Sequence, residues 1–194
     1  MKTFTKRYLP GEISDHRGKL NLRITGFHQQ SIVTVEEIVS AIDRLPSFHL
    51  EGLREIRFAP EDLIYHSSDY YEAHLPGPRK AEFRQPERRI LIYDFDSKSM
   101  FYQLLYHEIG HFVYFLAINS VVKKQWVTKV HPGLPSTTPY GSRNFAEDFA
   151  ESYACFVRDQ EDLRRRLPEK WQFMRDKVFS GKPETRKEKN NWMV

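Results

Sequence analysis

The stretch LLYHEIGHFVYF, at residues 104–115, places His107, Glu108 and His111 inside an otherwise apolar run. A helix brings residues four apart to the same face, so both imidazoles would lie one turn apart on that face. A buried polar group without a partner is costly, and core helices therefore rarely carry such groups. The stretch predicts a buried helix whose polar side chains either share a metal ion or are core histidines with separate partners.

The residues around this stretch predict a helical second half. Residues 100–118 contain no proline, and Asp96 or Ser97 can cap a helix there. The segment 131–144 is rich in proline and glycine and is expected to be a loop. Two further helices are predicted, at 145–160 and 168–179.

The first half has mostly β patterns. Residues 19–27 alternate apolar and polar side chains, which is typical of a half-buried strand, and we expect them to form the first strand. Residues 34–46 predict an amphipathic helix with Thr34 and Glu37 as a capping box. Shorter β-like segments lie at 54–58, 62–66 and 88–95, and residues 67–87 are expected to form a long irregular connection.

This order of elements predicts an α+β fold with a small mixed sheet, followed by a helical second half that begins with the HEIGH helix. The chain has 194 residues, of which 40% are hydrophobic, which is enough for one core. We expect a single domain over residues 1–180 and a polar, disordered tail at 181–194.

Composition narrows the functional classes. No apolar run reaches the roughly 20 residues that span a bilayer, and the start of the chain lacks the apolar run of a secretory signal, so we expect a cytoplasmic protein. The formal net charge is +4, but apart from residues 164–166 and the tail the basic residues are scattered, which argues against nucleic acid as the main partner. Cys155 is the only cysteine, so a metal would need His, Asp or Glu ligands.

The five residues HEIGH form the pattern HExxH. In this pattern two histidines hold zinc, which lowers the pKa of a water, and the glutamate, here Glu108, takes the proton. The competing interpretation is two histidines in the core, each satisfied by other partners. The extended metzincin pattern is excluded, because Tyr114 and Ala117 stand where it needs glycine and a third histidine.

A catalytic zinc site needs a third protein ligand. His131, in the loop, is one candidate. Glu147 and Glu151 are others, because they lie four apart on one face of a predicted helix, where one could bind zinc and the other could accept a hydrogen bond from a ligating histidine. The alternative is an exposed acidic face that includes Asp148. Spacing alone does not decide between the two glutamates.

The segments YHEIGH and YGSRNFAEDFAESYACF resemble the gluzincin metallopeptidases of the anthrax lethal factor catalytic domain type, which include the Pro-Pro endopeptidases. The resemblance covers residues 100–178 and leaves residues 1–87 unmatched. It implies a zincin-like fold, one Zn²⁺ per chain and cleavage of protein or peptide substrates. Substrate specificity does not carry over.

In that family a tyrosine lies seven residues before the ligating glutamate, and a second acidic residue follows the ligand by four. Tyr140, Glu147 and Glu151 have these spacings. The resemblance therefore implies that Glu147 is the third zinc ligand and that Glu151 supports a ligand. It also implies that Tyr140 can donate a hydrogen bond to the oxyanion of the reaction. The alternative for Tyr140 is an ordinary loop aromatic.

Three functions remain open: a zinc endopeptidase, a regulatory module that binds zinc with little catalysis, and a protease acting on nucleic-acid-bound proteins through residues 164–166 and the tail. Two structural expectations accompany them. Residues 88–95 are either a sheet edge that pairs with an extended peptide or an internal strand. Gly110 is unfavourable inside a helix; either a close contact with a neighbouring element favours it there, or it is a single glycine of the kind that helices tolerate.

Overall fold

The structure is a computed structural model that describes residues 12–15, 22–62 and 80–180. Its β strands form one mixed sheet of five strands in the order β1-β2-β3-β5-β4. The inner pairs β2–β3 and β3–β5 are parallel, and the outer strands β1 and β4 are antiparallel to their neighbours. The strands are β1 (Glu12–Asp15), β2 (Leu22–Thr25), β3 (Glu55–Phe58), β4 (Ala81–Arg84) and β5 (Arg89–Ile92).

The two faces of the sheet differ in polarity. Successive side chains of a strand point to opposite faces. Ile24, Ile56 and Ile90 are aligned across three strands, are almost completely buried and belong to the main hydrophobic core. On the other face Glu55 forms ion pairs with arginines of both neighbouring strands. The helices therefore cover one face of the sheet.

In the first half, α1 (Val35–Ile42) confirms the predicted helix and its cap. The Thr34 side chain accepts a hydrogen bond from the Glu37 backbone, and the Glu37 carboxylate accepts one from the Thr34 backbone. Four buried residues of α1 face the main core. Short 3₁₀ turns lie at Phe27–Gln29, Ser47–His49 and Pro60–Asp62.

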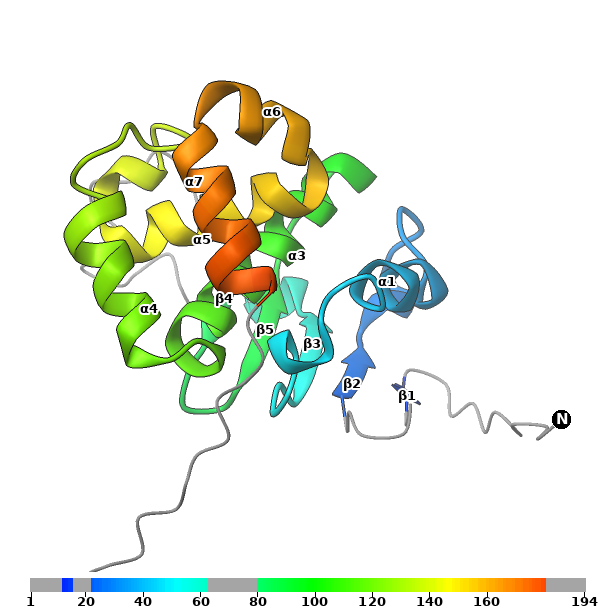
Figure 1. The fold of residues 1–194 in the computed structure, drawn as a ribbon. Helices are drawn as coiled ribbons and strands as arrows, with labels where there is room; N and C mark the ends of the chain where they lie inside the picture. The colour runs from blue at the N-terminus through cyan, green and yellow to red at the C-terminus, as the bar shows by residue number, and fades with distance from the viewer. Residues whose placement is uncertain (1–11, 16–21, 63–79, 181–194) are drawn as a thin grey trace, which may run out of the picture.

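The second half is helical, as predicted, and lies to one side of the strands (Figure 1). The long central helix is α3 (Lys98–Phe112), which Ser97 caps by accepting a hydrogen bond from the Met100 backbone. The α helices that follow are α4 (Ser120–Gln125), α5 (Phe145–Arg158), α6 (Gln160–Arg166) and α7 (Pro168–Phe173). The π-helical segments are Val113–Ala117, Trp126–Val130 and Met174–Phe179, and a 3₁₀ turn lies at Gly141–Arg143.

Helices α3 and α5 pack closely at Gly110, so the alternative of a close contact is the correct one. A Cβ atom on Gly110 would lie 2.9 Å from the Cα atom of Ala150 and 3.2 Å from the Cβ atom of Tyr153. Both distances are shorter than ordinary contacts, so only glycine fits without a shift. This close approach places Glu147 and Glu151 of α5 beside the HEIGH turn of α3.

Several predictions about the strands were wrong. Strand β1 precedes the strand that was expected to be first, and strand β4 lies within the connection expected to be irregular. Each contains one large apolar residue at most, so pairing with a neighbouring strand, rather than local pattern, determines its conformation. Residues 88–95 were expected to be either a sheet edge or an internal strand; β5 occupies Arg89–Ile92 of this segment and lies between β3 and β4, so the internal alternative is the correct one.

Of three other predictions, one is corrected by the structure and two fall partly or wholly outside the described residues. The helix expected at 145–160 ends at Arg158, and α6 follows it as a separate helix that the sequence did not predict. Of the β-like segment 62–66, Asp62 ends a 3₁₀ turn, and residues 63–66 lie outside the described residues. The tail at 181–194 also lies outside them.

No helix in the described ranges has the length and hydrophobicity required to cross a membrane.

Candidate metal centre

Three side chains from two helices converge at one point. His107 and His111 lie one turn apart on α3, and Glu147 lies in the first turn of α5. The two Nε2 atoms are 3.0 Å apart, and Oε2 of Glu147 lies 3.1 Å from Nε2 of His107 and 3.2 Å from Nε2 of His111. The three atoms therefore form a nearly equilateral triangle.

This triangle fits one face of a tetrahedral metal site. A tetrahedral ion with ligand distances of about 2.0 to 2.1 Å has ligand–ligand edges of about 3.3 Å. Oε2 of Glu147 and Nδ1 of His111 are buried, and neither has a hydrogen-bond partner among the residues that the structure describes. Leaving a buried carboxylate oxygen unsatisfied beside two ring nitrogens destabilises the folded protein. A cation bound among the three atoms would remove this cost. His107, His111 and Glu147 can thus hold a metal ion.

The start of α5 fixes the position of Glu147. Asn144 caps this helix, and its Oδ1 atom accepts hydrogen bonds from the backbone N–H groups of Ala146 at 2.9 Å and Glu147 at 3.0 Å. The cap satisfies two N–H groups that have no partner within the helix. It also ties the backbone of Glu147 directly to the preceding loop.

Glu151 contacts the ring nitrogen of His107 that is not part of the triangle. Its Oε1 atom lies 2.7 Å from Nδ1 of His107, and both side chains are buried. A carboxylate only accepts, so the Nδ1 atom of His107 carries the proton and Nε2 faces Glu147 and His111. Metal sites commonly use such a carboxylate to fix the tautomer of a ligating histidine.

Opposite charges pair strongly at this site in the absence of a metal. Burial by itself would lower the pKa of His107, but Glu147, Glu151 and the nearby Glu108 outweigh it and raise the pKa to about 10. Burial would also raise the pKa of Glu147, yet the two imidazoles lower it to about 2. A cation entering the site would replace the proton on Nε2 of His107.

The two residues predicted to be catalytic lie beside the triangle. Glu108 is almost completely buried on α3, next to His107 in sequence. Tyr140 is 41% exposed, and its ring meets the ring of His107 edge-on at 5.8 Å between centroids. The structure thus brings Tyr140 close to the triangle from the loop before α5.

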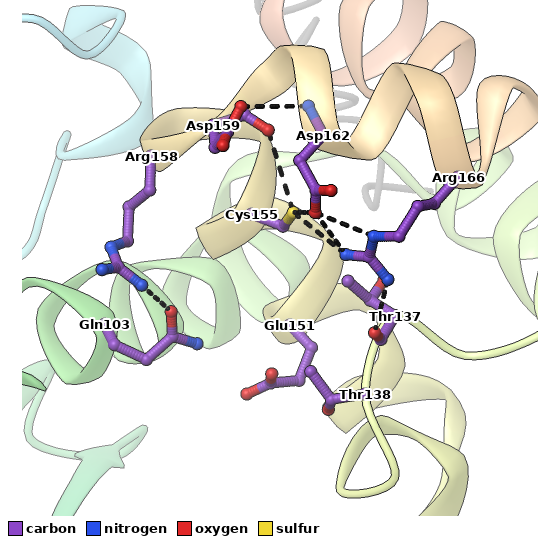
Figure 2. A pocket seen from close by; sticks show the side chains of 9 residues that line it. All are labelled: Gln103, Thr137, Thr138, Glu151, Cys155, Arg158, Asp159, Asp162 and Arg166. Carbon is purple, nitrogen blue, oxygen red and sulfur yellow. Dashed lines mark hydrogen bonds and ion pairs between the residues drawn. The ribbon is translucent and has the colours of Figure 1, made fainter.

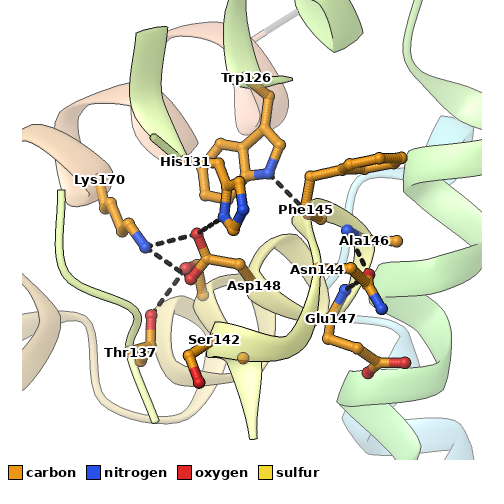
Figure 3. Close-up of polar contacts among 12 residues, drawn as sticks. Trp126, His131, Thr137, Ser142, Asn144, Phe145, Ala146, Glu147, Asp148 and Lys170 are labelled. Atoms are coloured by element: carbon orange, nitrogen blue, oxygen red, sulfur yellow. Dashed lines mark hydrogen bonds and ion pairs between the residues drawn. The ribbon is translucent and has the colours of Figure 1, made fainter. Parts of the chain in front are cut away.

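His131, the other candidate ligand, lies elsewhere. Its Nδ1 atom is 3.0 Å from Oδ2 of Asp148, whose carboxylate also accepts two hydrogen bonds from Lys170 at 2.6 and 2.7 Å (Figure 3). Asp148 is fully buried and Glu151 is 8% exposed. The alternative of an exposed acidic face is therefore wrong, because two of its three members are buried and paired.

Sequence reasoning missed the role of Lys170. This lysine has no exposed surface, and its Nζ atom also lies 5.4 Å from the ring centroid of Trp126. The sequence could have revealed that Lys170 is buried, because it lies in an apolar helical stripe. The neighbours of Lys170 at helical intervals, Leu163, Leu167 and Met174, are all buried. A lysine within such an apolar stripe needs a buried carboxylate, and Asp148 provides it.

Glu151, which contacts His107, also lines a polar pocket of about 420 Å³. Figure 2 shows the side chains that line this pocket. Arg158 donates hydrogen bonds to Gln103 and Ser99, and Arg166 pairs with Asp162. The lining residues are Gln103, Thr137, Thr138, Glu151, Cys155, Arg158, Asp159, Asp162 and Arg166.

The three arginines at 164–166 have acidic partners within their own helix. Arg164 pairs with Glu161, and Arg165 and Arg166 pair with Asp162. Such exposed pairs contribute little energy, but they neutralise much of the local positive charge. The structure therefore gives no support to this segment as a nucleic-acid contact.

No protein-family model and no curated protein matches this chain.

Proposed function

We propose that this protein is a zinc-dependent endopeptidase. The observation that carries the proposal is the triangle of His107, His111 and Glu147 with Glu108 beside it. Two imidazole nitrogens and one carboxylate oxygen suit Zn²⁺, and three protein ligands leave a fourth position for water or substrate. When bound, Zn²⁺ would act as a Lewis acid that lowers the pKa of water to about 7 and polarises the scissile carbonyl.

The surrounding residues have roles that follow from their positions. Glu108 would take a proton from the attacking water and pass it to the leaving amine. Glu151 would keep the proton on Nδ1 of His107, so that Nε2 remains free to bind the metal. Tyr140 would donate a hydrogen bond to the developing oxyanion.

The sheet offers a place for an extended peptide. Among the described strands β4 is at the edge nearest the site, since the ring of Phe83 on β4 lies 5.5 Å from that of Phe112 on α3. A peptide that pairs with an edge strand is held through its backbone. This mode of binding supports a protein or peptide substrate.

The test combines metal content with cleavage. The purified protein and its Glu108→Gln variant would be analysed for metals by mass spectrometry and then incubated with an unbiased peptide library. We expect about one zinc per chain in both proteins and cleavage only by the parent, because glutamine cannot accept the proton. Zinc without cleavage by either protein would favour a zinc-binding module. No zinc after reconstitution would refute the proposal.

A further inference from the structure

A positively charged side chain, that of Arg143, lies beside the candidate site and has no role in the proposed hydrolysis. Arg143 ends the 3₁₀ turn Gly141–Arg143, and its guanidinium carbon lies 4.2 Å from the ring centroid of Tyr140. Tyr140 in turn meets the ring of His107 at 5.8 Å. The guanidinium of Arg143 is therefore within about 10 Å of the His107 ring.

Arg143 differs from the other arginines that lie over aromatic rings. Arg164 and Arg175 both contact the Trp171 ring, and each also forms an ion pair with an acidic residue of its own helix. Arg143 is exposed, and within the described ranges no carboxylate lies at ion-pair distance from it. The ring of Tyr140 holds the guanidinium while leaving its charge unneutralised.

The candidate metal centre itself is rich in carboxylates. Glu108, Glu147 and Glu151 gather around the histidines, and even a bound divalent cation would not offset all three charges. These carboxylates would repel an acidic peptide and weaken its binding unless a positively charged side chain paired with the peptide's carboxylate. Arg143 provides that charge at the edge of the site.

We propose, on the basis of the proposed peptidase function, that Arg143 makes this site selective for peptides with an aspartate or glutamate close to the bond that is cut. A guanidinium presents a planar set of donors that binds a carboxylate through two parallel hydrogen bonds. An extended peptide rises about 3.3 Å per residue, so a separation of about 10 Å corresponds to a side chain within about three residues of the scissile bond.

The first test measures binding without cleavage. Glu108→Gln protein, zinc-loaded and zinc-free, would be titrated into fluorescein-labelled decapeptides of alanine and serine that carry one Asp, Asn or Lys at each central position in turn. Fluorescence anisotropy would give each Kd. We expect the best-placed Asp peptide to bind about tenfold more tightly than its Asn counterpart, since hydrogen bonds between charged groups are among the stronger ones.

Variants then assign the selectivity to this arginine. In the Glu108→Gln background, Arg143→Gln should abolish the preference for Asp and leave the Kd of the Asn peptide within about twofold, while Arg143→Glu should favour Lys. Arg175→Gln is the matched control, because it removes an arginine from over an aromatic ring elsewhere, and it should keep the preference.

Three outcomes would overturn the proposal: equal affinity for the Asp and Lys peptides, no measurable binding of any peptide, or the same change in the Arg175→Gln control. If Arg143→Gln weakened the Asp and Asn peptides equally, Arg143 would act only by supporting Tyr140, and the proposal would also be wrong. A preference for Asp in binding, together with an absence of cleavage by the parent protein, would refute the peptidase function and leave the selectivity of Arg143 standing.

Discussion

Glu147 and Glu151 lie one turn apart on α5 but face different parts of the site. Oε2 of Glu147 lies close to both Nε2 atoms, whereas Glu151 contacts the Nδ1 atom of His107. A ligand and its supporting group should respond differently to loss of charge. The two residues can therefore be separated by substituting each with glutamine, which preserves shape and removes the carboxylate.

We predict that Glu147→Gln lowers zinc affinity much more than Glu151→Gln. Loss of a supporting carboxylate typically reduces metal affinity about 10- to 100-fold, and loss of a direct ligand should exceed that range. Competition with a chromophoric chelator measures both affinities at one pH. Equal losses, or a larger loss for Glu151→Gln, would mean that Glu147 is not the direct ligand.

His49 shows how a buried histidine without a metal is satisfied. Its Nε2 atom lies 3.0 Å from the carbonyl oxygen of Val178, and its Nδ1 atom lies 2.9 Å from the hydroxyl of Tyr153. A carbonyl only accepts, so Nε2 carries the proton and Nδ1 accepts from Tyr153. Both ring nitrogens have partners, in contrast to Nδ1 of His111, which has none within the described ranges.

We predict that His49 makes the protein less stable as the pH falls from about 6.5 to about 4. Burial lowers the pKa of His49 from 6.5 to about 4 in the folded protein. Between these values only the unfolded chain takes up the proton, so the free energy of unfolding decreases by on the order of 3 kcal/mol at most. Urea denaturation at several pH values measures this slope.

The variant His49→Gln should flatten the slope over that pH window, and His28→Gln, which replaces an exposed histidine, should leave it unchanged. Parallel slopes for the parent protein and His49→Gln would show that His49 is not the titrating group.

At the scale of elements, the contact between α3 and α5 sets the geometry of the site. We predict that Gly110→Ala destabilises the protein by about 1 to 3 kcal/mol, although alanine favours helix by about 1 kcal/mol. The added methyl would meet the backbone of Ala150 at 2.9 Å, which cannot move as a side chain would. Chemical denaturation gives the change, and zinc affinity should fall with it because the helices separate.

An exposed helical site provides the control for this prediction. Lys124→Ala on α4 replaces an exposed residue and should change stability by less than about 0.5 kcal/mol. If Gly110→Ala proved as stable as the parent protein, the close packing of α3 on α5 would not be what requires glycine.

The elements that could be predicted from sequence are those with local signals. The capping box at Thr34 and Glu37 and the cap at Ser97 lie within one helical turn, so they could be recognised without knowing the fold. Strands β1 and β4 depend on pairing with β2 and β5, which lie elsewhere in the chain or across a turn. Helix α6 was missed because its short length and many charged residues leave little apolar periodicity.

The residues of the candidate site also divide into those with a local sequence signal and those that only the fold brings together. His107, Glu108 and His111 occupy one turn and could be recognised directly. Helical spacing pointed to Glu147 and Glu151, and a resemblance in sequence pattern pointed to Tyr140. The three-dimensional fold was required to show that the Nε2 atoms and the Glu147 carboxylate converge. The ion pair between Asp148 and Lys170 joins residues on different helices, and nothing in the local sequence matched one with the other.

At the scale of the whole molecule, this buried ion pair links three parts of the second half. Lys170 lies on α7, Asp148 on α5 next to Glu147, and His131 begins the loop that carries Tyr140. A Cβ atom on Gly141 would lie 3.3 Å from the Cα atom of Asp148, so the loop also packs directly against this residue. The ion pair therefore holds together the segments that supply Tyr140 and Glu147.

We predict that Lys170→Met destabilises the protein by about 3 to 5 kcal/mol, because it leaves the charge of Asp148 buried without its main partner. The double variant Lys170→Met/Asp148→Asn should recover most of that loss, since a neutral pair carries no unpaired charge. Thermal and urea denaturation of the three proteins measures both effects, with Arg165→Met, which breaks an exposed pair with Asp162, as the control.

A double variant no more stable than Lys170→Met would show that packing of the lysine stem, rather than its charge, is what α7 contributes. Recovery of stability without recovery of zinc affinity would mean that the charged pair also fixes where Glu147 lies.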